Sequence, residues 1–335
     1  MDLARKVFDS SYNLFKPFLF YATKKDPEWA HDLFVSFSKF LTLTKLEKFF
    51  LDNESNYKRL PFEISNAAGL DKNAEISPEF FRYLGFDRVV YGTFTEEKWE
   101  GNPRPRTKRI VKEKSLINNI GWENDGSKVI SSRLRFHKNY EVPITISVGF
   151  TPDPTLSIEQ KWRYLKKVFN QFNGKGIHCI NRIEYNPSCP NLLISREENQ
   201  KLLREIVPFI KSNLSPWQEL NIKVSPDLDE REIDNFIKLT YDFTDGYVLT
   251  NTTKKHNYGN GSASGNILYA LSLETQKKFY ERLQNTSKKI IACGGIDSVE
   301  KIKERLEYGA KEIQIFTPLI FEGPGLLRDL RKIEF

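Results

Sequence analysis

The chain has 335 residues, of which 39% are hydrophobic and 28% are charged, and this composition excludes a disordered or fibrous protein. Its length allows either one large α/β barrel with an appendage or two ordinary domains. The formal net charge is +7, but the lysines and arginines are spread through helical segments together with acidic residues. We therefore expect an anionic small molecule or an anionic membrane surface as a partner, and no nucleic acid.

The cysteines and histidines predict neither disulfides nor a metal site. The three cysteines, Cys179, Cys189 and Cys293, are an odd number at distant positions, which favours reduced thiols inside a cell. The four histidines have no ligand spacing to the cysteines or to pairs of carboxylates. We therefore expect no bound metal.

Residues 1–50 are predicted to form a helical extension. Segment 1–21 is rich in aromatic residues, and Asp26, Pro27 and Glu28 mark the start of a second helix, because aspartate caps helices and proline fits their first turn. Neither helix has the roughly 18 to 20 uninterrupted apolar residues that a membrane span needs. The extension is expected to pack onto the main body, to lie on a membrane surface, or to do both with different faces.

From residue 60 onward, short apolar runs alternate with amphipathic segments. The predicted strands are residues 62–68, 88–93, 144–148, 177–185, 220–224, 246–249, 289–293 and 312–316. The predicted helices are residues 157–172, 196–211, 229–241, 273–283 and 298–308. This alternation predicts an α/β fold of the (β/α)8 TIM-barrel type, with a doubly wound sheet as the alternative.

The polar residues that follow these strands would meet at one end of such a barrel, where barrel enzymes have their active sites. Segment 186–191 (Asn-Pro-Ser-Cys-Pro-Asn) is the most informative of them, since its amides offer donors and acceptors and its thiol can ionise. On its own, it also fits a proline-stiffened turn with a buried thiol. Gly294, Gly295 and Thr317 follow the last two strands and indicate a phosphate site that suits FMN better than NAD.

Five further motifs resemble a known family. They are 67–72 (Ala-Ala-Gly-Leu-Asp-Lys), 100–106 (Glu-Gly-Asn-Pro-Arg-Pro-Arg), 117–118 (Ile-Asn), 250–253 (Thr-Asn-Thr-Thr) and 293–295 (Cys-Gly-Gly). In order and spacing the chain resembles the dihydroorotate dehydrogenases, specifically their membrane-associated, quinone-using class, over nearly its whole length. The resemblance implies an FMN-binding barrel, residues 51–335, that oxidises dihydroorotate to orotate in pyrimidine synthesis. It also implies that residues 1–50 give a membrane quinone access to this barrel.

The same resemblance assigns roles to individual residues. Cys189 stands at the position of the catalytic base. The substrate positions are Lys72, Asn118, Trp122, Asn186, Asn191, Asn251 and Thr252. The flavin positions are Ala68, Gly69, Lys72, Thr93, Ser147, Asn186, Lys223, Thr250, Ser264, Gly265, Gly294, Gly295, Phe316 and Thr317. The quinone positions are His31 and Arg109.

These residue types suit the implied chemistry. A lysine and several asparagines supply the charge and the paired donors and acceptors that a ring with a carboxylate and a cyclic urea requires. A base must remove a proton from one carbon while hydride leaves the adjacent carbon for the flavin. Lys223 is expected to offset negative charge on the flavin.

Five positions or segments depart from the quinone class. Cys189 stands where that class has serine, although cysteine occurs there in the soluble class and ionises more easily, with an unperturbed pKa of about 8.5. Ser147 replaces an asparagine, and segment 149–152 (Gly-Phe-Thr-Pro) replaces a loop that carries a lysine. Trp122 and Glu123 stand in place of phenylalanine and asparagine, and Phe316 in place of a tyrosine.

The sequence therefore predicts an FMN-dependent, quinone-reducing dihydroorotate dehydrogenase, a monomer or weak homo-oligomer. It is expected at the cytoplasmic face of a membrane, in bacteria the inner membrane, as a peripheral protein. One alternative is a divergent flavoenzyme that acts on another cyclic ureide or another acceptor. The other is a non-catalytic barrel that binds FMN or a phosphorylated ligand and docks a partner through its aromatic extension. The convergent amides of Asn118, Asn186, Asn191 and Asn251 argue against both alternatives.

Overall fold

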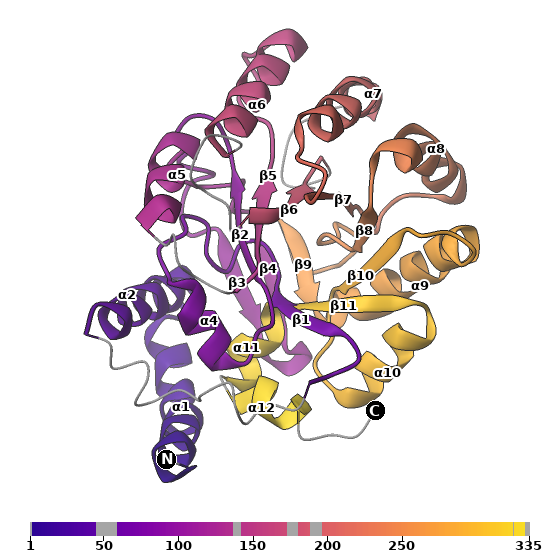
Figure 1. Cartoon of the computed structure of the whole chain (residues 1–335). Helices are drawn as coiled ribbons and strands as arrows, with labels where there is room; N and C mark the ends of the chain where they lie inside the picture. Colours follow the sequence, from indigo (N-terminus) through magenta and orange to yellow (C-terminus); the bar gives the residue numbers. More distant parts are fainter. Residues whose placement is uncertain are drawn as a thin grey trace.

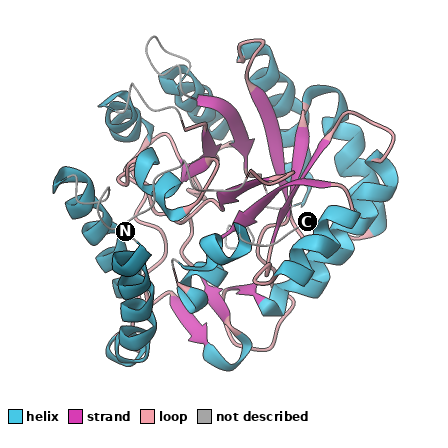
Figure 2. Cartoon of the chain, turned by 60° about the horizontal axis from the view of Figure 1, so that its bottom comes forward, coloured by secondary structure: helices cyan, strands magenta, loops and turns pink. Residues whose placement is uncertain are grey.

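Eight parallel strands form a barrel at the centre of the protein (Figures 1 and 2). The computed structural model describes residues 2–44, 59–136, 142–172, 180–187, 196–323 and 325–331. The barrel strands are β1 (Glu63–Asn66), β2 (Val89–Phe94), β5 (Ile144–Val148), β6 (Ile180–Tyr185), β7 (Glu219–Val224), β8 (Gly246–Leu249), β10 (Lys289–Cys293) and β11 (Ala310–Ile315). They are hydrogen-bonded in the order β1-β11-β10-β8-β7-β6-β5-β2, and a parallel bridge between Ser65 and Arg88 joins the two end strands. The predicted (β/α)8 barrel is confirmed, and the doubly wound alternative is wrong.

Helices surround the barrel and bury the outer faces of its strands. They are α4 (Pro78–Leu84), α5 (Ser127–Phe136), α6 (Ile158–Phe172), α7 (Arg196–Asn213), α8 (Glu230–Thr240), α9 (Asn266–Leu283), α10 (Val299–Glu307), α11 (Thr317–Glu322) and α12 (Gly325–Arg331), with single 3-10 turns η2 (Val111–Glu113) and η3 (Tyr241–Phe243). Most bounds lie within three residues of the prediction. The exception is α9, which begins at Asn266 directly after Gly265, whose φ of +82° ends the preceding strand. The prediction placed this start too late because the first turn of α9 carries no capping side chain.

A small second sheet lies in the connections that follow the barrel strands. Its strands are β3 (Thr107–Ile110), β4 (Ser115–Asn118) and β9 (Ser262–Gly265), paired antiparallel in the order β3-β4-β9. β3 and β4 lie between β2 and β5 in the chain, and β9 follows β8, so this sheet belongs to the carboxyl end of the barrel. It was not predicted, because each strand has only four residues and no clear apolar alternation.

The amino-terminal end of the barrel is closed by buried charges. Glu312 of β11 accepts a hydrogen bond from Ser65 Oγ at 2.5 Å and pairs with Arg182 of β6. Burial raises the pKa of Glu312, but Arg182 and Arg88 outweigh that effect and lower it. Removing one member of such a cluster leaves an unpaired buried charge. These residues therefore serve stability, at the end of the barrel opposite the predicted site.

The N-terminal extension consists of α1 (Asp2–Ala22) and α2 (Glu28–Thr44), which lie beside α4 and α11 (Figure 1). Tyr12 Oη donates to the Ile320 carbonyl at 2.5 Å, and Lys16 Nζ donates to the Phe321 carbonyl at 2.6 Å. The Phe34 ring packs edge-on against Phe80 of α4. Asp26 caps α2 by accepting from the Glu28 amide at 3.1 Å. One side of the extension thus packs onto the barrel, and in the described part of the chain no helix combines the length and apolarity of a membrane span.

Candidate active site

One cavity of about 560 Å³ joins the carboxyl end of the barrel to the N-terminal extension. Its polar part is lined from strand ends and the loops after them, including Thr93, Asn186, Lys223 and Asn251. Its apolar part is lined by α1 and α2, including Phe15, Phe20, Leu33, Phe34 and Phe37. A cavity of this size and mixed lining is typical of a site for a cofactor and a small ligand. The two groups of residues predicted for the ring chemistry and for the extension therefore share one space.

The predicted amides are connected by hydrogen bonds in the polar part. Asn251 Nδ2 donates to Asn186 Oδ1 at 3.0 Å, and Asn186 Nδ2 donates to Thr93 Oγ1 at 3.1 Å. Asn118, at the end of β4, donates from Nδ2 to the Ser262 carbonyl of β9 at 3.2 Å. The second sheet thus places Asn118 opposite the barrel amides. Cys189 and Asn191 lie outside the described residues.

Lys223 lies at the floor of the cavity beside a buried acid. Its ammonium is 3.3 Å from Glu184 Oε1, and both side chains are at least 95% buried. Glu184 Oε2 also accepts from Gln314 Nε2 at 3.0 Å, while Gln314 Oε1 has no hydrogen-bond partner among the described residues. This ion pair holds the Lys223 side chain in place. Glu184 was not among the predicted site residues, because it stands inside a barrel strand and belongs to no recognised motif.

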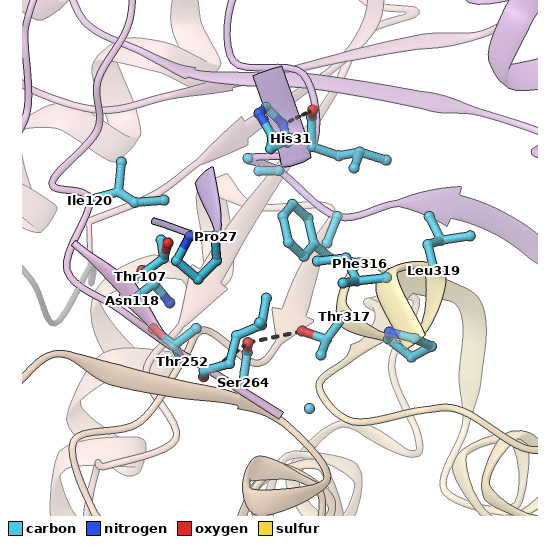
Figure 3. A pocket seen from close by; sticks show the side chains of 18 of the residues that line it. Pro27, His31, Thr107, Asn118, Ile120, Thr252, Ser264, Phe316, Thr317 and Leu319 are labelled. Atoms are coloured by element: carbon cyan, nitrogen blue, oxygen red, sulfur yellow. Dashed lines mark hydrogen bonds between the residues drawn. The ribbon is translucent and has the colours of Figure 1, made fainter. Parts of the chain in front are cut away.

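Glycines bring the backbone up to the cavity wall. Gly294 and Gly295 have φ of +118° and +68°, a region that other residues rarely adopt. A Cβ on Gly295 would lie 2.5 Å from the Gly265 carbonyl oxygen, so the two loops approach too closely for any side chain. Nearby, Thr317 Oγ1 donates to Ser264 Oγ at 2.9 Å, and in Figure 3 Phe316 lies between this pair and His31. Ala68, Gly69, Thr250 and Thr252 complete this wall.

Trp122 and segment 149–152, which both depart from the quinone class, are in contact in the structure. The Trp122 indole packs edge-on against Phe150, with 5.4 Å between ring centroids. A Cβ on Gly149 would lie 2.4 Å from the same indole. Gly149 therefore leaves room for the indole, because a side chain at residue 149 would collide with it. Ser147 lies inside β5, where its Oγ is 3.0 Å from Thr93 Oγ1 and donates to Glu184 Oε1 at 3.4 Å.

Lys72 is held by two carboxylates. Its ammonium lies 2.6 Å from Glu123 Oε2 and 3.4 Å from Glu28 Oε1, which comes from the extension. Arg106 joins the same group, with Nη2 at 2.9 Å from Glu28 Oε1 and 2.7 Å from Glu123 Oε2. The loop that carries Lys72 is fixed by Asp71, which accepts from the Ile76 amide at 2.8 Å. The sequence pointed to Lys72 but not to these partners, which come from three separate segments.

The Glu28 carboxylate fixes the extension to the barrel. Its side chain is 2% exposed and contacts Arg104, Arg106 and Lys72. Burial raises the pKa of Glu28, but the hydrogen bond from Arg106 and the charge of Lys72 outweigh it and lower the pKa from 4.5 to about 2. A carboxyl whose pKa is lower in the folded than in the unfolded state stabilises the fold above its unfolded pKa. That stabilisation is lost as the pH falls toward about 2.

We expect Glu28→Gln to lower the free energy of unfolding by about 3 kcal/mol at neutral pH, because it removes the buried anion that Arg104, Arg106 and Lys72 share. The difference from the unaltered protein should shrink as the pH falls from about 4 toward about 2. Urea unfolding at several pH values measures it. Glu100→Gln is the control, since this carboxylate is 77% exposed and pairs with Lys98. A difference that stays constant down to about pH 3 would contradict this role of Glu28.

The predicted quinone residues lie at the junction between α1, α2 and the barrel. His31 Nε2 donates to the Leu70 carbonyl at 2.8 Å (Figure 3). Arg109 donates to Thr23 Oγ1 at 2.9 Å and to the Pro27 carbonyl at 3.1 Å, while its Nε has no hydrogen-bond partner among the described residues. Burial lowers the pKa of Arg109. Both side chains line the cavity, and Arg109 offers it an unused donor.

Residues 54–333 match the family described as dihydroorotate dehydrogenase. The chain belongs to this family. It is 30% identical to a dihydroorotate dehydrogenase (quinone) of Natronomonas pharaonis, over 96% of this chain and 93% of that protein. It is also 30% identical to the protein of the same name from a Nitratiruptor species, with the same coverage. Among solved structures, DHODH from Eimeria tenella in complex with ferulenol matches with a TM-score of 0.76 at 24% identity, over 92% of this chain and 90% of that chain.

Membership in the dihydroorotate dehydrogenase family makes this protein a flavin-dependent oxidoreductase. The Eimeria structure supports the barrel fold. Among the residues that the structure describes, no group of histidine, cysteine and acidic side chains has the arrangement of a metal site.

Proposed function

We propose that this protein oxidises dihydroorotate to orotate in pyrimidine (UMP) biosynthesis, with FMN as its flavin and a membrane quinone as electron acceptor. The observation that carries this proposal is the shared cavity, which has amides and a lysine at one end and the aromatic extension at the other. The relatives from Natronomonas and Nitratiruptor are both named dihydroorotate dehydrogenase (quinone).

The residues present fit FMN. At Gly265 and Gly295 the backbone is free of side chains, so a phosphate can reach the backbone amides there. The hydroxyls of Ser264 and Thr317 lie next to these glycines. Gln314 Oε1, buried and without a described partner, is available to a donor in the cavity. When bound, the flavin supplies the hydride acceptor. Glu184 holds Lys223 in place, and Lys223 puts a positive charge next to the part of the cavity proposed for the flavin.

The substrate's ring and carboxylate match the polar side chains. Asn118, Asn186 and Asn251 present amide donors and acceptors from opposite sides of the cavity, as the cyclic urea requires. Lys72 supplies the cation for the carboxylate. Trp122 and Thr252 line the same region, and Asn191 is proposed as a fourth amide. Together these groups would hold the ring in one orientation, which is the main requirement for a defined hydride transfer.

Cys189 is proposed as the base. It stands three residues after Asn186, whose side chain lines the cavity. A thiol with an unperturbed pKa of about 8.5 needs only a modest shift to act as a base near neutral pH. Its role is to take the proton from the ring carbon adjacent to the one that loses hydride.

The extension is proposed to serve the quinone and the membrane. Its inner aromatic side chains line the cavity, and Arg109 Nε and His31 lie where that lining meets the barrel. Its outer face exposes large apolar side chains, including Phe18 at 71%, Tyr21 at 80% and Leu43 at 83%. Such a face, with lysines close by, suits binding in the interface of an anionic membrane. We propose that this extension comprises residues 1–50. We also propose that the protein binds peripherally to the cytoplasmic face of a membrane, in bacteria the inner membrane, and that it is a monomer or weak homo-oligomer.

The substrate half of the proposal can be tested without a quinone. The purified protein should be yellow and should lose its visible absorbance when dihydroorotate is added without oxygen, with one orotate formed per flavin. Dihydrouracil, which lacks the carboxylate, is the comparison, and we expect it to bleach the protein far more slowly. A yellow protein that dihydroorotate leaves unchanged at millimolar concentration would contradict the proposal and favour another ureide or a non-catalytic role.

A further inference from the structure

The carboxylate of Glu123 lies on the ammonium that the substrate needs. Glu123 Oε2 is 2.6 Å from Lys72 Nζ, nearer than any other carboxylate oxygen paired with this lysine in the described part of the chain. Glu123, Lys72 and Trp122 line the same cavity. A substrate carboxylate at Lys72 would therefore meet an anion already in contact with it, and two carboxylates that share one ammonium repel each other.

Glu28 and Glu123 are not equivalent partners of Lys72. Glu28 is 2% exposed and is held by Arg104 and Arg106 as well as by Lys72. Glu123 is 34% exposed and makes both of its ion pairs, to Lys72 and to Arg106, through Oε2. Glu28 is thus fixed inside the protein, whereas Glu123 borders solvent and can turn toward it more readily than Glu28 can.

We propose that Glu123 is a displaceable ligand of Lys72 that competes with the substrate's carboxylate and so sets affinity and selectivity. This inference rests on the proposed function, since it takes Lys72 as the carboxylate-binding residue. A ligand with a carboxylate gains Lys72 only by moving Glu123 toward solvent, and part of its binding free energy is spent on that exchange. A neutral ring of the same shape leaves the Glu123–Lys72 pair intact. Glu123 therefore weakens binding of the acid and leaves binding of the neutral ring unaffected. As a result, it lowers the ratio of the affinity for the acid to the affinity for the neutral ring.

The test is titration of the FMN-loaded protein with orotate and with uracil, the same ring without the carboxylate, followed by the change in the visible spectrum. For Glu123→Gln and Glu123→Asn we expect orotate to bind about tenfold more tightly, because the carboxylate of Glu123 no longer competes with that of orotate for Lys72. Uracil should bind no more tightly than before. The KM for dihydroorotate should fall with the orotate dissociation constant, while kcat changes by less than about twofold.

Asp125→Asn is the matched control. It removes one negative charge from the same loop, but Asp125 pairs with Arg133 at 2.6 Å and not with Lys72. It should leave both dissociation constants unchanged. In a Lys72→Met background, Glu123→Gln should no longer tighten orotate, because the competition acts through that ammonium.

The outcomes separate the two proposals. If the unaltered protein binds orotate but Glu123→Gln and Glu123→Asn bind it equally or less tightly, Glu123 does not compete and the inference is overturned, while the proposed function stands. Equal tightening of orotate and uracil would also overturn it, since that would indicate a general change of the pocket. A protein that neither binds orotate nor is bleached by dihydroorotate would overturn the proposed function, and this inference with it.

Discussion

Substitution of Cys189 by alanine should slow the anaerobic reduction of the protein by dihydroorotate about 10²- to 10⁴-fold, the usual contribution of a positioned general base. Binding of orotate should change much less, because the amides of Asn118, Asn186 and Asn251 and the ammonium of Lys72 remain. Stopped-flow measurement of the loss of visible absorbance, with orotate titration in parallel, separates the two effects.

Cys189→Ser gives a second, chemically related variant. Serine retains a group that can accept the proton but ionises far less readily, so we expect partial activity that rises toward higher pH. The thiol of Cys293 is the matched control, because it is buried, lines the same cavity and has a pKa raised by burial. Cys293→Val should therefore not change the pH dependence of the rate at which dihydroorotate bleaches the protein. A fully active Cys189→Ala variant would remove Cys189 from the mechanism.

Deletion of residues 1–50 should abolish the reduction of long-chain ubiquinone or menaquinone analogues and the binding to anionic liposomes. Both follow from the loss of the aromatic lining and of the exposed apolar face, while the polar part of the cavity remains in the barrel. Dihydroorotate should still bleach the truncated protein. Deletion also removes Glu28, however, and leaves Arg106 with Glu123 as its remaining carboxylate partner in the described residues.

A point variant tests the same pathway with Glu28 in place. Ala30 of α2 lines the cavity next to His31, so Ala30→Trp should fill the apolar passage. We expect it to lower quinone turnover at least about tenfold, with unchanged bleaching by dihydroorotate. Ser36→Trp adds the same side chain to an exposed position of α2 and should change neither activity. Full quinone turnover in both the truncated protein and Ala30→Trp would show that the quinone does not enter between α1 and α2.

The sequence predicted the barrel well because parallel strands that are buried on both faces leave nearly continuous apolar runs, as in β8 and β10. The same periodicity also located the loops after the strands, and with them Thr93, Lys223 and Asn251. The β3-β4-β9 sheet could not be predicted, since its order is set by hydrogen bonds between segments that are about 150 residues apart, as between Asn118 and Ser262.

The sequence did not predict the charged contacts of the site, for a related reason. Glu28 comes from the extension, Arg106 directly precedes β3, and Glu123 lies in the loop after β4, and nothing in the sequence links these three residues to Lys72. The packing of α2 against the barrel brings Glu28 to Lys72, and the fold of the β3-β4 region brings Arg106 and Glu123 there. The contact of Trp122 with segment 149–152 shows the same limit, because the sequence records both departures but not their contact.

The most direct test of the account is steady-state turnover of the unaltered protein with dihydroorotate and a soluble ubiquinone or menaquinone analogue. We predict one orotate for each quinone reduced, with fumarate and NAD supporting little or no turnover. Bleaching by dihydroorotate together with a preference for fumarate or NAD would contradict the quinone assignment. The absence of any orotate with every acceptor would contradict the account as a whole.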